Sequence, residues 1–109
     1  AKRVHVVGHS MGAGAAGALR LSRGSRIAST ALLAGAPRLG GGADSGPLYL
    51  AGGELDPLAS ASSLRRAAES VRAEGAEVEF RLLPGRGHTL FVGDVLPEAL
   101  AWCLARSRP

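Results

Sequence analysis

Residues 4–12 read VHVVGHSMG, and this stretch decides the fold. The β-branched run from Val4 to Val7 favours a buried strand, and the small residues that follow the stretch are compatible with a helix. Between them, Ser10 has a glycine two places away on either side, Gly8 and Gly12. A serine on a very tight strand-to-helix turn presents its hydroxyl to a substrate, and glycine leaves room for that turn. The same pattern is also typical of an ordinary turn.

The composition is that of a small globular protein. The chain has 109 residues, of which 46% are hydrophobic and 20% charged, so it has room for one domain and is not wholly disordered. No apolar run approaches the roughly 20 residues that a membrane-spanning helix needs. The first residue is alanine, so the absence of a leader-like start carries no information about targeting or compartment.

The charge balance is basic but dispersed. Arginine and lysine total 13 against nine acidic residues, which gives a formal charge of +4. Only Arg65 and Arg66 are adjacent, and the four aromatic residues do not interleave with the arginines. Nucleic-acid binding, which needs a concentrated basic patch, is therefore not predicted. The single cysteine, Cys103, cannot form an internal disulfide and is interpreted as a packed thiol.

Strand-like and helix-like segments alternate along the chain. Apolar or β-branched runs predict strands at residues 4–7, 27–33, 47–51 and 78–83. Helical patterns occupy residues 13–21, residues 64–71 and a segment that opens at Pro97. This alternation predicts an α/β fold with a mostly parallel sheet of about four strands flanked by helices. We expect one domain over residues 1–109, without a cap domain.

Local signals predict the helix boundaries. Ser62 or Ser63 is expected to cap the second helix, and Gly75 to stop it. Proline is tolerated at the first helical position, so the last helix is expected to begin at Pro97. Its predicted buried stripe consists of Leu100, Ala101 and Leu104.

Three residues with the chemistry of hydrolysis follow the carboxyl ends of predicted strands. Ligands of open α/β sheets bind at this edge, so we expect Ser10, Asp56 and His88 to lie close together. Serine is a poor nucleophile until a base accepts its proton, and a third group must hold that base in the right tautomer. The predicted roles are nucleophile for Ser10, general base for His88 and orienting acid for Asp56. The backbone N–H of Met11, at the start of the next helix, is predicted to face the oxyanion.

Several residues compete for these roles. Glu54 is the nearest rival for the acid, and Asp56 is itself a typical turn or capping residue because proline follows it. Asp94 is interpreted as a helix cap. His5 lies within the first strand. His9 is held beside the serine, where it packs or lines a pocket.

The motifs GHSMG at residues 8–12, GGELDP at 52–57 and GRGH at 85–88 resemble the α/β-hydrolase family, whose serine, acid and histidine follow in that chain order. The resemblance covers nearly the whole chain and looks like the carboxylesterase and dienelactone-hydrolase-like branches. It implies a serine hydrolase that cleaves carboxylic esters or related small-molecule acyl substrates through an acyl-enzyme. Such chemistry needs no cofactor and no metal.

The sequence departs from the family in two ways. The family's sheet usually has about eight strands with the serine after the fifth, whereas Ser10 follows the first, so the resemblance implies a C-terminal half. The loop that usually supplies a second oxyanion donor precedes the nucleophile, and losing one donor typically costs about 100- to 1000-fold in rate. Residues 37–46 are too short for a cap domain, so we expect an open site that favours smaller acyl substrates. The first strand is expected to be an exposed edge, which a missing N-terminal half or self-association would cover.

Two alternative functions stay open. One is a catalytically inactive fragment or a non-enzymatic relative. The other is an NAD(P)-binding oxidoreductase, because residues 12–17, GAGAAG, fit the GxGxxG dinucleotide fingerprint. Gly12 lies beyond the expected strand end, however, and no acidic residue ends the second strand. We therefore favour the interpretation that these small residues let the helix lie close to the sheet. The choice among ester, thioester, lactone and peptide bond is open.

Overall fold

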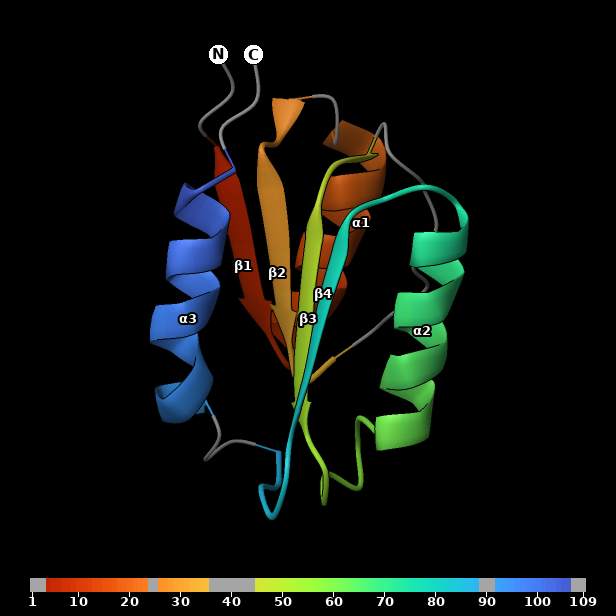
Figure 1. The fold of residues 1–109 in the computed structure, drawn as a ribbon, viewed down its shortest axis with the longest axis vertical. Helices are drawn as coiled ribbons and strands as arrows, with labels where there is room; N and C mark the ends of the chain where they lie inside the picture. Colours follow the sequence, from red (N-terminus) through yellow and green to blue (C-terminus); the bar gives the residue numbers. More distant parts are fainter. Residues whose placement is uncertain (1–3, 24–25, 36–44, 89–91, 107–109) are drawn as a thin grey trace.

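A computed structural model describes residues 4–23, 26–35, 45–88 and 92–106 (Figure 1). Four parallel strands form one sheet in the order β1-β2-β3-β4. The strands are β1 (His5–His9), β2 (Ser29–Leu33), β3 (Leu48–Gly53) and β4 (Val78–Leu83). The helices are α1 (Met11–Arg23), α2 (Ala61–Ala73) and α3 (Val92–Leu104). The predicted fold class is confirmed.

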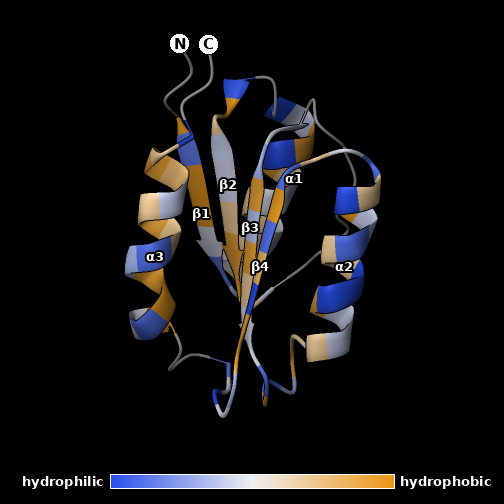
Figure 2. Ribbon diagram, viewed as in Figure 1, coloured by the Kyte–Doolittle hydropathy of each residue, from blue (hydrophilic) through white to orange (hydrophobic). Residues whose placement is uncertain are grey.

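The helices form a layer on each face of the sheet. Helices α1 and α2 cover one face and α3 covers the other (Figure 1). Successive strand residues point to opposite faces, so Leu32 of β2 packs with α1 and α2 while Ala31 and Leu33 pack with α3. Strands β2 and β3 are buried throughout, as parallel strands covered on both faces should be. Figure 2 shows hydrophobic and hydrophilic residues alternating along α2, the pattern of a helix with one face on a sheet.

The structure corrects one predicted helix start and confirms one stop. Ser60, not Ser62 or Ser63, is the N-cap of α2, and its hydroxyl accepts a hydrogen bond from the Ser63 N–H at 3.3 Å. The helix begins at Ala61, three residues before the predicted apolar stripe starts at Leu64. Gly75 follows the C-cap with a φ of 99°, a left-handed conformation that suits glycine, so the predicted stop is confirmed.

The prediction for the last helix was wrong. Helix α3 begins at Val92, so Pro97 lies inside it, and Asp94 is in its first turn rather than ahead of it. A proline this near a helix start removes only one backbone hydrogen bond. The buried stripe also differs from the predicted one. The residues that pack against the sheet are Val95, Ala99 and Cys103, whereas Leu100, Ala101 and Leu104 are exposed.

Two other predictions concern single segments. Cys103 is 1% exposed, and burial raises the pKa of its thiol, which confirms the packed thiol. The predicted glycine-rich connection over residues 37–46 lies almost wholly outside the described residues. None of the helices in the described ranges is long and apolar enough to cross a membrane.

Strand β1 lies at an edge of the sheet and, within the described residues, pairs only with β2. Val4 and Val7 are 59% and 40% exposed at this edge. An exposed apolar edge strand offers unpaired backbone groups to another chain. We therefore expect residues 1–109, expressed alone, to form dimers or larger species in size-exclusion chromatography with light scattering at micromolar concentration. A lysine at the edge, Val7→Lys, should shift the population towards monomer; a monomeric, cooperatively melting wild-type sample would contradict the prediction.

Candidate active site

The turn after β1 places Ser10 in a strained conformation. Ser10 has a φ of 57°, which is in the left-handed region and costs a non-glycine residue about 1–3 kcal/mol. Its N–H donates to the Leu33 carbonyl at 2.8 Å, so the end of β2 holds the turn in place. Helix α1 begins at the next residue. The serine hydroxyl is therefore presented at the carboxyl edge of the sheet, directly beside a helix N-terminus.

The two glycines around Ser10 differ in their need to be glycine. A Cβ on Gly8 would lie 2.3 Å from the Gly12 carbonyl oxygen and 2.8 Å from the Ala16 Cβ, so the turn and the close approach of α1 exclude a side chain there. A Cβ on Gly12 would meet no described atom within 4 Å. Gly8 therefore has a steric reason to be glycine, whereas the described residues outside the backbone of α1 give no such reason for Gly12.

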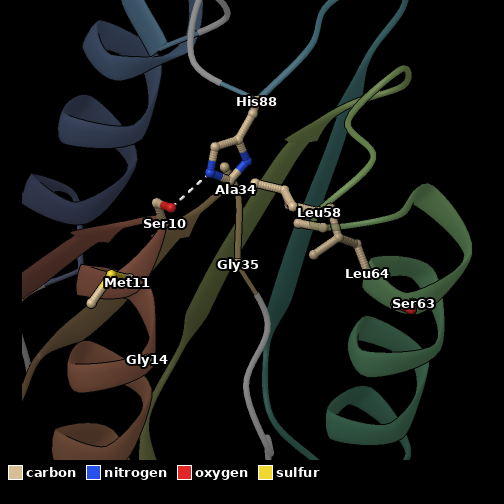
Figure 3. A pocket seen from close by; sticks show the side chains of 10 residues that line it. Ser10, Met11, Gly14, Ala34, Gly35, Leu58, Ser63, Leu64 and His88 are labelled. Carbon is tan, nitrogen blue, oxygen red and sulfur yellow. Dashed lines mark hydrogen bonds between the residues drawn. The ribbon is translucent and has the colours of Figure 1, made fainter.

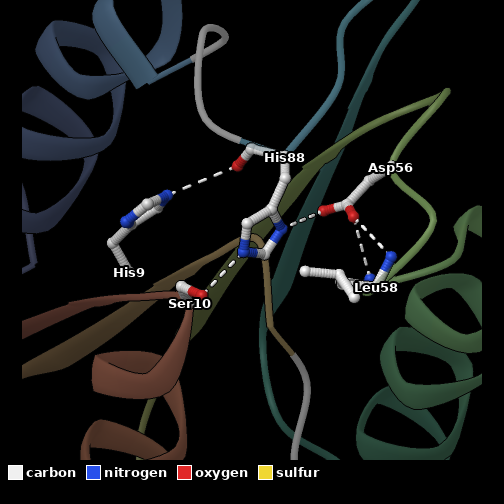
Figure 4. Close-up of polar contacts among 6 residues, drawn as sticks. His9, Ser10, Asp56, Leu58 and His88 are labelled. Atoms are coloured by element: carbon white, nitrogen blue, oxygen red, sulfur yellow. Dashed lines mark hydrogen bonds and ion pairs between the residues drawn. The ribbon is translucent and has the colours of Figure 1, made fainter.

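Ser10, His88 and Asp56 form a continuous chain of hydrogen bonds (Figure 4). The Ser10 Oγ lies 2.7 Å from His88 Nε2, and His88 Nδ1 lies 2.6 Å from Asp56 Oδ2. An ionised carboxylate only accepts hydrogen bonds, so Nδ1 carries the proton and donates. The lone pair of Nε2 is then free to accept the Ser10 hydroxyl proton. The structure brings together the three side chains that the strand ends indicated.

The second carboxylate oxygen of Asp56 also accepts hydrogen bonds. Its Oδ1 accepts from the Leu58 and Ala59 N–H groups at 2.7 and 3.0 Å, and the side chain is 0% exposed. Burial acts to raise the pKa of this carboxyl, but the hydrogen bonds from His88, Ala59 and Leu58 outweigh it and lower the pKa below the ordinary value. The carboxyl is thus both a turn residue, as its sequence context indicated, and the partner of His88.

The loops that carry Asp56 and His88 are docked directly on each other. Leu55 N–H donates to the Arg86 carbonyl at 2.9 Å, and Gly85 N–H donates to Glu54 Oε1 at 3.2 Å. A Cβ on Gly53 would lie 2.2 and 2.3 Å from the Gly87 and Arg86 carbonyl oxygens. Gly53 therefore lets the histidine loop cross the end of β3. The sequence pattern at Gly52-Gly53 indicates only a turn. It does not reveal this contact, because the two segments are over 30 residues apart in the chain.

The alternative candidates for the acid and the base do not take part in the hydrogen-bond chain. Glu54 is exposed and holds the Gly85 backbone, so it is not the partner of His88. His5 Nδ1 lies 2.6 Å from the Ser29 hydroxyl, at the opposite ends of β1 and β2 from Ser10. His9 Nε2–H donates to the His88 carbonyl at 3.4 Å, with the two rings 5.8 Å apart (Figure 4). His9 thus contacts both the backbone and the ring of His88, whose Nε2 in turn bonds to Ser10.

A cavity of about 400 Å³ opens beside Ser10 and His88. Figure 3 shows it between the first turns of α1 and α2, with the end of β2 at Ala34 and Gly35 between them. The lining residues are Ser10, Met11, Gly14, Ala34, Gly35, Leu58, Ala59, Ser63, Leu64 and His88. A volume of about 300–1,000 Å³ is usual for small-molecule sites. The backbone N–H of Met11 belongs to the first turn of α1, where N–H groups have no partner within the helix.

The GxGxxG stretch lies wholly inside α1, from Gly12 to Gly17. In a dinucleotide-binding turn the first glycine stands at the strand end, whereas here the strand ends at His9 and the turn is formed by Ser10. Ala13, Ala16 and Gly17 are buried against the sheet. The position of the stretch agrees with close packing of the helix on the sheet.

Comparison with known proteins gives the same architecture. No family model and no curated protein matches the sequence. Among solved structures, a thermostable esterase aligns with a TM-score of 0.80 at 16% identity, over 98% of this chain and 32% of that one. Arabidopsis thaliana SOBER1 aligns with a TM-score of 0.79 at 20% identity, over 92% and 51%. The Bacillus cereus carboxylesterase aligns with a TM-score of 0.74 at 24% identity, over 91% and 48%.

Fold and comparisons together define the class: this chain has the α/β-hydrolase fold. It spans about a third to a half of the length of these solved structures, which is consistent with the predicted C-terminal half. The resemblance indicated by the three sequence motifs is confirmed at the level of the fold.

Proposed function

We propose that the protein is a serine hydrolase that cleaves esters or related acyl compounds through an acyl-enzyme. The observation that carries the proposal is the hydrogen-bond chain from Ser10 through His88 to Asp56, with links of 2.7 and 2.6 Å, at the mouth of a cavity. Each residue is a type suited to its place, since the carboxylate holds His88 in the tautomer whose Nε2 takes a serine proton. The hydrolase fold of the structural neighbours supports the same conclusion.

The proposed reaction has two halves. Ser10 Oγ attacks the substrate carbonyl carbon while its proton passes to His88 Nε2, and the Met11 N–H faces the resulting oxyanion. The tetrahedral intermediate collapses, the bond to the leaving group breaks, and His88 gives the proton to that group. A water molecule then attacks the acyl-enzyme, with its proton taken by His88, and release of the acid restores Ser10. Asp56 stabilises the imidazolium that forms in each half.

The test is intact-mass labelling of the intact protein with a fluorophosphonate probe. We expect a single adduct on the wild type and none on Ser10→Ala, because an unactivated serine reacts poorly with such probes. Ser63→Ala is the matched control: Ser63 lines the same cavity, but its hydroxyl bonds to the Ser60 hydroxyl at 2.8 Å. It should keep the adduct. An adduct that survives in Ser10→Ala, or its absence from the wild type, would contradict the proposal.

A further inference from the structure

His88 is held on one side by the loop that carries Asp56. Its ring bonds to the Asp56 carboxylate at 2.6 Å, and the residues just before it bond to Leu55 and Glu54. These contacts all come from the segment that follows β3. A Cβ on Gly87 would meet no described atom within 4 Å, so the main chain beside His88 is not tightly packed there. Contacts from the opposite side of the site therefore help to set the position of the imidazole.

The opposite side of the site reaches His88 through two neighbouring residues, His9 and Ser10 (Figure 4). The Ser10 Oγ lies 2.7 Å from the ring nitrogen Nε2, and His9 Nε2–H donates to the main-chain carbonyl of His88 at 3.4 Å. The rings of His9 and His88 are 5.8 Å apart, within the range in which aromatic rings pack. One bond therefore reaches the ring of His88 and the other its backbone, and two such contacts fix an orientation as well as a distance.

The two contacts differ in what happens to them during the proposed reaction. When Ser10 is acylated, its Oγ carries the acyl group and no proton, and neutral His88 has no proton on Nε2 either. The 2.7 Å hydrogen bond is then lost, yet His88 must stay in place to take a proton from the attacking water. The bond from His9 needs only a proton on its own Nε2, so it is independent of the state of Ser10.

We propose that His9 is a positioning residue whose N–H holds the backbone of His88 in place during hydrolysis of the acyl-enzyme. The inference rests on the proposed function and assigns a role within the second half of that reaction. His9 is not among the residues that line the cavity, so it acts through His88 and not through the substrate. The motif around Ser10 does not reveal this role, because His88 lies 79 residues later in the chain than His9.

The experiment measures the two halves of the reaction separately, on the intact protein with p-nitrophenyl acetate. Rapid-quench mass spectrometry gives the rate constants for formation and for loss of the acetyl-enzyme. His9→Phe keeps a ring but removes the N–H. We expect it to slow loss of the acetyl-enzyme by about three- to tenfold, the effect of one hydrogen bond, and to keep the rate constant for formation within about twofold of wild type. In the steady state, kcat and KM should then fall together while kcat/KM changes little.

Three further variants test whether the N–H is responsible. His9→Gln supplies an amide donor in place of the ring N–H and should keep the loss of the acetyl-enzyme within about twofold of wild type. His9→Ala removes the donor without adding bulk and should reproduce the slow loss, so the test does not depend on how a phenylalanine packs. His5→Phe is the matched control, because His5 belongs to the same strand but bonds to Ser29 at the end far from Ser10. It should leave both rate constants unchanged.

The outcomes separate this inference from the proposed function. If the wild type forms and loses the acetyl-enzyme, but His9→Phe and His9→Ala do so at wild-type rates, the role of His9 is wrong and the hydrolase stands. The role is equally wrong if formation slows as much as loss, if His9→Gln is as slow as His9→Ala, or if His5→Phe shows the same change. If the wild type neither reacts with fluorophosphonate nor forms an acetyl-enzyme, both are overturned.

Discussion

Replacing Asp56 by asparagine should lower kcat for ester hydrolysis by about 10,000-fold while leaving Ser10 and His88 in place. The carboxylate Oδ2 accepts from His88 Nδ1–H at 2.6 Å, and an amide NH₂ at that position donates instead. His88 would then carry its proton on Nε2, where it cannot accept the Ser10 hydroxyl proton. Steady-state kinetics and the rate of fluorophosphonate labelling should fall together.

Glu54→Gln is the matched control for this variant. Glu54 lies two residues before Asp56, is exposed, and accepts from Gly85 N–H, a bond that a glutamine carbonyl oxygen keeps. It should retain nearly full activity. Equal losses in the two variants would show that the charge of the loop matters rather than the contact with His88.

The lowered pKa of Asp56 gives the same variant a second readout. In the folded protein the pKa lies below its unfolded value of about 3.9, so this carboxyl stabilises the fold fully above that pH. The stabilisation is lost as pH falls through the folded pKa, because the unfolded state then binds more protons. The difference in free energy of unfolding between wild type and Asp56→Asn should therefore narrow as pH falls below about 4, as measured by urea denaturation.

Adding a single methyl group at Gly53 should have the second-largest effect. In Gly53→Ala the Cβ would lie 2.2 Å from the Gly87 carbonyl oxygen and 2.3 Å from that of Arg86. Both obstacles are backbone, so the histidine loop has to move away from β3. We expect activity to fall at least about 100-fold, since a displacement of about 1 Å has effects of that size. We also expect a loss of about 1–3 kcal/mol in the free energy of unfolding.

Gly87→Ala is the control for the histidine loop. A Cβ on Gly87 would meet no described atom within 4 Å, although this residue is next to His88. The variant should keep activity within a few-fold of wild type. A comparable loss in both variants would indicate that the loop needs flexibility, and not that it needs the close contact with Gly53.

The parts of the site that sequence predicted are those with local signals. Ser10, Asp56 and His88 each follow a strand, and a parallel sheet gathers the residues at its strand ends, so order and residue type were enough to place them. The core of the central strands was predictable for the same reason, because continuous apolar runs are typical of buried parallel strands.

The parts that sequence did not predict depend on distant contacts. Gly53 matters because of the carbonyl of Gly87, and no periodicity or turn pattern connects the two. The phase of α3 was misjudged because Leu100 and Leu104 are larger than Ala99 and Cys103, yet the sheet selects the smaller residues for its close approach. The cavity is likewise formed by residues of separate elements, so no single segment of the sequence indicates its position or volume.

Because the Asp56 loop is hydrogen-bonded to the His88 loop, the candidate site consists of two units that are each held together internally. Acid and histidine belong to one unit, tied by the Leu55–Arg86 and Glu54–Gly85 hydrogen bonds, whereas Ser10 belongs to the unit of β1 and α1. The two units meet at the 2.7 Å hydrogen bond between Ser10 and His88 and at the 3.4 Å hydrogen bond from His9 to the His88 carbonyl. We therefore expect a chain that pairs with the outer edge of β1 to affect the contacts of Ser10 and His9 with His88 more than the contact of His88 with Asp56.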